Sequence, residues 1–192
     1  MQLTTATKIT LVRMFLVPFV AIGILYHRYN VALILFFICG ITDLLDGLVA
    51  RKLGQKTKVG ALLDPMADKL LLSTSFLLLA LPSSNLPVSI PIWLAVLVFG
   101  RDLIIVISSV AIALTTGFTK FDPSIYGKAS TALQIVCVLA VLVVNDFGID
   151  QVWINWLFYL TFGLTLFSGL HYIYVFTKRY NLENPHDPKP QE

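Results

Sequence analysis

Six long apolar runs, separated by short polar segments, constrain the fold of this chain more than any other feature of its sequence. A helix needs about 20 mostly apolar residues to cross a lipid bilayer. Backbone groups in hydrocarbon must be hydrogen-bonded within their own segment, so spanning segments are helices rather than open strands. The predicted spans are residues 8–26, 31–51, 60–82, 91–115, 128–146 and 152–176.

The composition supports a membrane environment. The chain has 192 residues, of which 57% are hydrophobic and 13% charged, whereas soluble domains carry about 25% charged residues. So few polar side chains cannot cover a surface that faces water, and the length fits one domain. We therefore expect an all-α, polytopic membrane protein in the lipid bilayer, with a six-span domain over 1–176 and a polar cytoplasmic tail over 177–192.

Basic residues concentrate at one set of span ends. With a cytoplasmic N-terminus, the cytoplasmic segments contain Lys8, Arg51, Lys52, Lys56, Lys58, Lys120, Lys128, Lys178, Arg179 and Lys189. The opposite turns contain only Arg28. The positive-inside rule therefore predicts that both termini and the loop after the second span are cytoplasmic. The first residues are not rich in Arg and Ser as a transit peptide would be, so we expect a bacterial plasma membrane.

Two sets of small side chains carry structural expectations. Cys39 and Cys137 stand alone in apolar runs without metal-ligand spacing, and are predicted to be buried apolar residues. Small residues inside the predicted helices could allow close helix contacts. They are Gly23, Gly40, Gly47, Ala67, Gly100, Gly163 and Gly169.

Four aspartates lie inside or at the cytoplasmic ends of the second and third predicted spans. Asp43 and Asp46 share one helix face at i,i+3 spacing, and Asp64 and Asp68 share another at i,i+4. A charge near the bilayer centre costs about 3 kcal/mol, and four carboxylates also repel one another. Because the two spans are antiparallel neighbours, both pairs can converge on a polar, cytoplasm-facing cavity. Carboxylate oxygens suit Mg²⁺ or Mn²⁺; the four could hold one or two ions, and two would cancel their charge.

The same region carries a longer pattern of fixed spacing. Residues 43–68 read D-x2-D-G-x2-A-R-x8-G-x3-D-x3-D. This pattern resembles the signature of the CDP-alcohol phosphotransferase family, and every fixed position matches. Two further segments resemble the first and fifth spans of that family, so the resemblance covers most of the chain. They are Thr10-x2-Arg13-x4-Pro18 and Gly127-Lys128-x2-Thr131-x2-Gln134.

The resemblance implies a role for each motif position. Asp43, Asp46 and Asp64 would be metal ligands, and Asp68 would be the general base and also touch a metal. The CDP-binding surface would be formed by Gly47, Ala50, Arg51 and Gly60. Glycine lets a nucleotide approach the helix backbone, and an arginine can contact phosphate through two N–H groups. The implied reaction transfers a phosphatidyl group from CDP-diacylglycerol to an alcohol and releases CMP, with two Mg²⁺ or Mn²⁺ ions as cofactors.

Basic residues in or beside the spans bear on the acceptor alcohol. Lys69, Arg101, Lys128 and Arg13, joined by Thr131 and Gln134 of the fifth-span pattern, form the predicted acceptor site. A basic pocket fits an acceptor that itself carries phosphate. Adjacent helical residues point in different directions, so Arg101 and Asp102 are not expected to neutralise each other, although a structural ion pair is the alternative interpretation.

Glycerol 3-phosphate is the first expectation for the acceptor. Arg101-Asp102 and the Lys128-x-x-Thr131 form also resemble members of the family that use phosphatidylglycerol and make cardiolipin, which is the alternative. A membrane transporter would use intramembrane acids as relay groups. It is less well supported because the acids concentrate in one motif and no internal repeat is found. A homodimer is possible in this family, and no nucleic-acid partner is expected.

Overall fold

A computed structural model describes residues 5–53, 58–81, 86–116, 125–148 and 152–183. The backbone of 43–53 and 58–68 is helical, but side chains in 43–66 and at 68 lie outside the described part. The predictions for Asp43, Asp46, Gly47, Ala50, Arg51, Gly60, Asp64 and Asp68 can therefore be followed at the level of helix position only.

The described residues form six helices and contain no strand, which confirms the all-α prediction. Each helix covers most or all of one predicted span. The helices are α1 (Thr5–Leu25), α2 (Tyr29–Leu53), α3 (Lys58–Ala80), α4 (Ile92–Thr116), α5 (Ile125–Phe147) and α6 (Val152–Glu183). The main departure is α6, which continues seven residues beyond the predicted end of the last span at 176.

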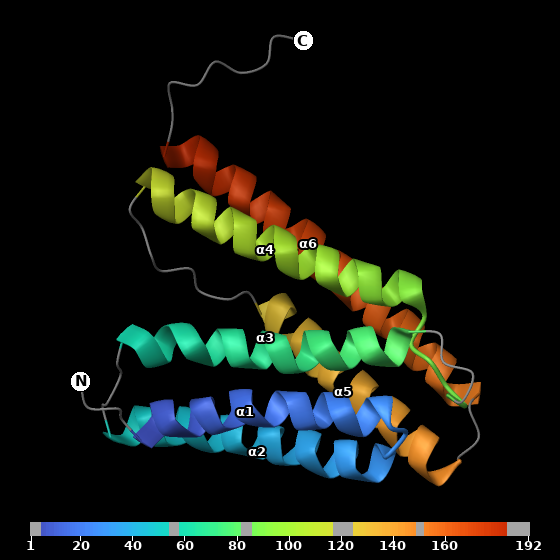
Figure 1. Ribbon diagram of the computed structural model, residues 1–192. Coiled ribbons are helices and arrows are strands. Elements are labelled where there is room, and N and C mark those ends of the chain that lie inside the picture. The colour runs from blue at the N-terminus through green and yellow to red at the C-terminus, as the bar shows by residue number, and fades with distance from the viewer. Residues whose placement is uncertain (1–4, 54–57, 82–85, 117–124, 149–151, 184–192) are drawn as a thin grey trace.

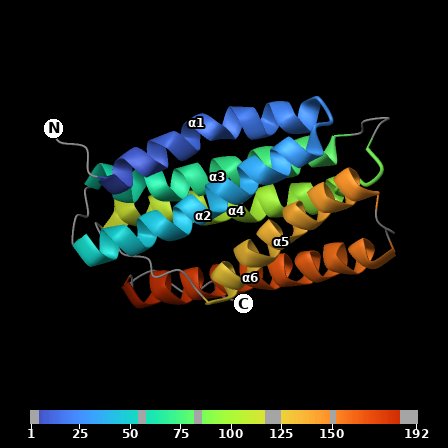
Figure 2. The ribbon, with the colours of Figure 1, turned by 90° about the horizontal axis from the view of Figure 1, so that it is seen from below.

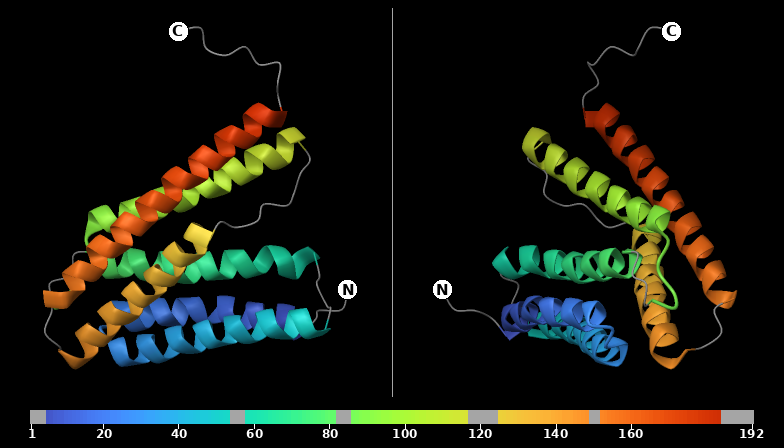
Figure 3. Two further views of the ribbon diagram at one scale, coloured as in Figure 1. Left: turned by 180° about the vertical axis from the view of Figure 1, so that it is seen from behind. Right: turned by 45° about the vertical axis from the view of Figure 1, so that its right-hand side comes forward.

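The first three helices alternate in direction, so α1 and α3 begin at the same end of the bundle (Figure 1). Helix α1 packs against both α2 and α3, and α5 crosses obliquely between α2 and α6 (Figure 2). Helices α4 and α6 run side by side and are inclined to the α1–α3 group (Figure 3). The C-terminal half of α2 and the N-terminal half of α3, which carry the aspartates, therefore lie at the end of the bundle where α1 begins.

Polar side chains lie inside this bundle and large apolar side chains lie outside. Phe15, Trp156 and Val96 are 68%, 75% and 65% exposed, whereas Arg13 and Gln134 are 1% and 2% exposed. Water-soluble domains rarely expose apolar patches this extensive, and lipid is the solvent that favours them.

By length and apolarity, α5 and residues Val152–Val175 of α6 can cross a membrane. Shorter apolar stretches occupy Thr10–Leu25, Tyr29–Thr42 and Lys69–Ala80. Cys39 and Cys137 are both buried, as predicted.

The predicted helix contact at small residues occurs at Gly23. A Cβ atom built there would lie 3.2 Å from the backbone nitrogen and Cβ of Ala32, so α1 and α2 are in close contact where a side chain is missing. At Gly40, Gly100 and Gly163 a Cβ would meet nothing within 4 Å in the described structure. A glycine in an apolar run therefore marks a helix contact only in some cases.

A helix cap and an asparagine side chain stabilise the end of the bundle opposite the aspartate motif. His27 has a positive φ of 56° and ends α1. The N–H of Arg28 donates to Gly23 O at 2.8 Å and that of His27 to Ile24 O at 3.1 Å, which is the Schellman pattern. Farther along, the side chain of Asn145 on α5 holds the segment before α4. Its Oδ1 accepts the Val88 N–H at 2.9 Å and its Nδ2 donates to Val88 O at 2.8 Å.

Candidate active site

The buried faces of α2 and α3 lead directly to the aspartate positions. On α2 the buried residues Ala32, Phe36 and Cys39 follow each other at spacings of four and three residues. Positions 43 and 46 continue that series in the same helix. A residue that repeats at this spacing stays on one helical face. Asp43 and Asp46 therefore occupy the continuation of the face by which α2 packs into the bundle.

Helix α3 repeats this arrangement in the opposite direction. Its buried residues include Leu71, Leu72 and Ser75. Positions 64 and 68 precede them at helical spacing, so both lie on the face that packs inward. Helical register therefore predicts that both pairs of aspartate positions face inward at one end of the bundle.

Helix α1 contributes polar side chains to the same end. Thr10 and Arg13 are 0% and 1% exposed, and they begin a buried series that continues through Val17 and Val20. Because α1 packs against both motif helices, Arg13 brings a positive charge into the bundle beside the helices that carry the four acids. Before the motif, Thr42 donates to the carbonyl oxygen of Ile38, so its hydroxyl is satisfied within α2.

A compact charged cluster joins α3, α4 and α6. Asp102 accepts from Arg101 Nη1 through Oδ1 at 2.7 Å and pairs with Lys69 Nζ through Oδ2 at 3.4 Å. Arg101 Nη2 donates to Ser168 Oγ on α6 at 3.0 Å. The expectation that Arg101 and Asp102 do not neutralise each other was therefore wrong. The guanidinium group is long enough to reach back to the neighbouring carboxylate, although the two Cβ atoms leave α4 in different directions.

Glycine makes room for the arginine in this cluster. A Cβ built at Gly169 would lie 3.5 Å from Arg101 Cγ, so the aliphatic stem of Arg101 lies over that position of α6. Only 8% of Arg101 is exposed. Asp102 and Ser168 were not among the predicted site residues. Asp102 had a usable signal, since it follows a basic residue inside an apolar span, but Ser168 resembles any other small polar residue of a membrane helix.

The predicted acceptor residues on α5 are arranged differently. Gln134 Nε2 contacts Ser130 Oγ at 3.3 Å and Thr165 Oγ1 at 3.4 Å, within a buried polar seam between α5 and α6. Thr131 donates to Gly127 O of its own helix at 3.1 Å, and Lys128 is exposed. The hydrogen bonds and ion pairs of the described residues connect Lys69 with Arg101 through Asp102. They do not extend from that cluster to Lys128, Thr131 or Gln134.

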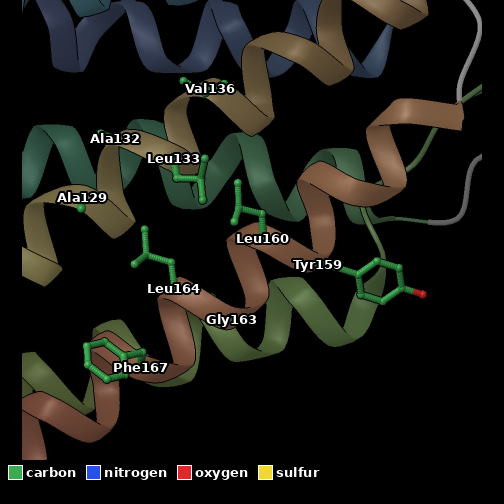
Figure 4. Close-up of a pocket in the computed structure, with 9 residues that line it drawn as sticks. All are labelled: Ala129, Ala132, Leu133, Val136, Tyr159, Leu160, Gly163, Leu164 and Phe167. Carbon is green, nitrogen blue, oxygen red and sulfur yellow. The ribbon is translucent and has the colours of Figure 1, made fainter.

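An apolar groove of about 660 Å³ lies between α5 and α6. In Figure 4 its walls are Leu133 and Val136 of α5 with Leu160 and Leu164 of α6, and Tyr159 and Phe167 lie toward its ends. Hydrocarbon side chains offer no ligands to a metal or a phosphate. The groove is therefore not the polar cavity that the aspartate motif predicts. Among the residues with described side chains, no group of three His, Cys, Asp or Glu gathers.

The fold and the motif together define a helical membrane protein whose acidic motif positions lie on two consecutive helices. The sequence profile of the CDP-alcohol phosphatidyltransferases matches residues 3–167. The chain belongs to this family of membrane enzymes, which favours catalysis over the transporter alternative.

Curated relatives agree with this assignment. The CDP-diacylglycerol–glycerol-3-phosphate 3-phosphatidyltransferase of Aquifex aeolicus is 33% identical over 142 residues, covering 74% of this chain and 77% of the relative. The Salmonella choleraesuis protein of the same name is 31% identical over 177 residues, covering 90% and 94%. The CMP-forming cardiolipin synthase of Rattus norvegicus is 30% identical over 186 residues, covering 88% of this chain but 60% of the longer relative.

Proposed function

We propose that this enzyme transfers a phosphatidyl group from CDP-diacylglycerol to glycerol 3-phosphate and releases CMP. The observation that carries the proposal is the register of α2 and α3. It continues both buried faces into the four aspartate positions of a complete family motif. The bacterial relatives named for this reaction match most of the chain and support this choice of acceptor.

The chemistry of the four carboxylates fits a divalent-metal site. Asp43, Asp46, Asp64 and Asp68 supply only oxygen ligands, which Mg²⁺ and Mn²⁺ prefer, and two ions would balance their charge. Such ions, when bound, supply electrostatic stabilisation to the pyrophosphate and to the departing CMP.

The other motif residues bind and orient the substrates. Arg51 holds a phosphate of the CDP group, while Gly47, Ala50 and Gly60 leave space for the nucleotide beside the helices. Asp68 accepts the proton of the acceptor hydroxyl as its oxygen attacks the phosphorus that carries diacylglycerol. Positioning of these groups accounts for most of the rate enhancement, as in other phosphoryl transfers.

The acceptor's phosphate requires positive charge near the motif. Lys69 directly follows Asp68, and its ion pair with Asp102 connects it to Arg101 on α4. We assign these two side chains to the acceptor phosphate, and Arg13, which is buried on α1, adds a further positive charge inside the bundle. Thr131 and Gln134 of α5 are assigned to the rest of the acceptor, and exposed Lys128 supplies a further positive charge that attracts the anion.

Phosphatidylglycerol is the second candidate acceptor. Asp102 removes one unit of charge from the two cations that it pairs with, and the remaining single charge also suits a phosphodiester. The similarity to a cardiolipin synthase points the same way.

The membrane arrangement belongs to the same proposal. Six transmembrane helices surround a cytoplasm-facing polar cavity in a bacterial plasma membrane. Residues 1–176 form the catalytic domain, 177–192 form a cytoplasmic tail, and two copies associate as a homodimer. The start of α1 and the end of α6 lie at the same end of the bundle, which supports termini on one side of the membrane (Figure 1).

CMP release by the purified enzyme tests the reaction. CDP-diacylglycerol and Mg²⁺ are supplied with glycerol 3-phosphate or phosphatidylglycerol in parallel. We expect release with glycerol 3-phosphate, its loss in Asp68→Asn, and its loss with a chelator until Mg²⁺ is restored. Release with phosphatidylglycerol alone would establish the second candidate, and no release with either acceptor would contradict both.

A further inference from the structure

Asp102 uses each of its carboxylate oxygens for a different cation. Oδ1 accepts from Arg101 at 2.7 Å, and Oδ2 lies 3.4 Å from Lys69 Nζ. The three side chains carry one net positive charge. Since Lys69 belongs to α3 and Arg101 to α4, the single carboxylate sets the distance between two basic groups on different helices.

The cations keep hydrogen-bonding capacity after these contacts. Only 8% of the surface of Arg101 is exposed, and its Nε makes no hydrogen bond in the described part of the structure. The Lys69 ammonium is buried at its nitrogen and makes the ion pair with Asp102 but no hydrogen bond there. Burying a charged donor without a hydrogen-bond acceptor is unfavourable. A ligand with anionic oxygens would satisfy both.

Arg101 is held from the other side as well. Ser168 accepts from its Nη2 at 3.0 Å, and its stem lies against Gly169. Two of its three nitrogens are thus anchored to protein groups, which leaves Nε in a fixed position. The Lys69 side chain, by contrast, is 38% exposed as a whole, although its Nζ is buried, and its stem is flexible. Asp102 is the one partner described for its ammonium group.

We propose that Asp102 is a positioning residue for the acceptor: it holds Lys69 and Arg101 as one anion-binding pair whose unused donors bind the acceptor's phosphate. The inference rests on the proposed function and adds a residue to it. Without Asp102 the lysine would leave its place, and the acceptor would lose a preorganised contact rather than gain a free charge.

Steady-state kinetics of the full-length enzyme test this role. CMP release is measured with glycerol 3-phosphate varied at saturating CDP-diacylglycerol, and then with the two reversed. We expect Asp102→Asn to raise KM for glycerol 3-phosphate about tenfold and to change KM for CDP-diacylglycerol less than twofold. Asp102→Glu keeps the charge and should restore most of the acceptor affinity. The control, Asp146→Asn, changes an exposed acid of α5 and should leave both constants unchanged.

Other outcomes overturn the proposal. A lower KM for glycerol 3-phosphate in Asp102→Asn would mean that Asp102 competes with the acceptor. Parallel changes in both KM values, or a lower melting temperature with unchanged kinetics, would reduce Asp102 to a structural ion pair. If Asp102→Asn does not fold, Ser168→Ala removes the other anchor of Arg101 and should raise the acceptor KM about threefold. An unchanged KM there would equally count against the proposal.

Binding of inorganic phosphate tests the role of Asp102 independently of the proposed reaction. An enzyme that releases no CMP with any acceptor contradicts the reaction, whatever Asp102 does. Thermal unfolding with and without phosphate still reports on the anion-binding pair. Phosphate should raise the melting temperature of the wild type and of Asp146→Asn, and not that of Asp102→Asn. Equal shifts in all three proteins would overturn the role of Asp102.

Discussion

Gly23 lies where α1 packs against Ala32 of α2 with no room for a side chain. In Gly23→Ala the new Cβ would lie 3.2 Å from backbone and side-chain atoms of Ala32, which a helix cannot move away independently. Separating α1 from α2 costs about 1–3 kcal/mol, more than the ~1 kcal/mol gained in helix propensity. We expect a lower unfolding temperature in detergent.

Gly40→Ala is the matched control for that change. Its Cβ would meet nothing within 4 Å, so only the gain in helix propensity remains, and the unfolding temperature should rise or stay unchanged. A destabilised Gly40→Ala beside an unaffected Gly23→Ala would show that the close approach of α1 and α2 is not what stabilises the pair.

Asn145 is the second residue with a large expected effect. Its amide satisfies both the N–H and the C=O of Val88, which is 6% exposed, and also donates to Val141 O at 2.9 Å. Asn145→Ala leaves both Val88 groups buried without partners, and we expect a loss of about 2–4 kcal/mol. Chemical unfolding followed by circular dichroism measures it, and the neighbouring exposed Asp146→Ala should change stability by less than about 0.5 kcal/mol.

At the scale of elements, the junction of α1 and α2 depends on a left-handed residue that is not glycine. His27 has φ of 56°, and its ring Nδ1 lies 2.7 Å from the Tyr29 hydroxyl. Both His27→Gly and His27→Ala lose this contact, but only alanine keeps the steric cost of the left-handed conformation, about 1–2 kcal/mol. We expect His27→Gly to be the more stable of the two by about 1 kcal/mol in thermal unfolding. Equal stabilities would mean that the turn relaxes to another conformation.

The polar seam between α5 and α6 shows how membrane helices specify their partners. Ser130, Gln134 and Thr165 hydrogen-bond within it, with Ser130 Oγ and Thr165 Oγ1 3.1 Å apart. In lipid, apolar side chains on two helices gain little by leaving the solvent for each other. Hydrogen bonds that only one rotation of each helix can form therefore help to define which faces meet.

At the scale of the whole molecule, the proposed orientation puts the end of α5 outside the cell and the end of α2 in the cytoplasm. Topology can be tested with cysteines, because native Cys39 and Cys137 are both 0% exposed and should react slowly. Asp146→Cys and Lys52→Cys place one thiol at each end of the bundle. We expect a membrane-impermeant maleimide to label Asp146→Cys in intact cells, and Lys52→Cys only after permeabilisation. Labelling of Lys52→Cys in intact cells would contradict the proposed orientation.

The six helices could be predicted from the sequence, since apolar length and the hydrogen-bonding needs of a backbone in lipid leave few alternatives. The sequence also determined the family, because the aspartate motif has fixed spacing along the chain. Local spacing also predicts which acids share a helical face, and this stays a prediction because the side chains at 43, 46, 64 and 68 lie outside the described part.

The contacts between polar side chains of different helices could not be predicted from the sequence. Helical spacing suggested that Arg101 and Asp102 would point apart, but Arg101 Nη1 lies 2.7 Å from Asp102 Oδ1. Asp102 also forms an ion pair with Lys69 of another helix. The partnership of Arg101 with Ser168 joins residues 67 positions apart. A helix's own period fixes the direction of each Cβ, whereas a long side chain finds its partner only after neighbouring helices have taken their rotation and tilt. That rotation depends on contacts such as Gly23 with Ala32, which no single segment of the sequence contains.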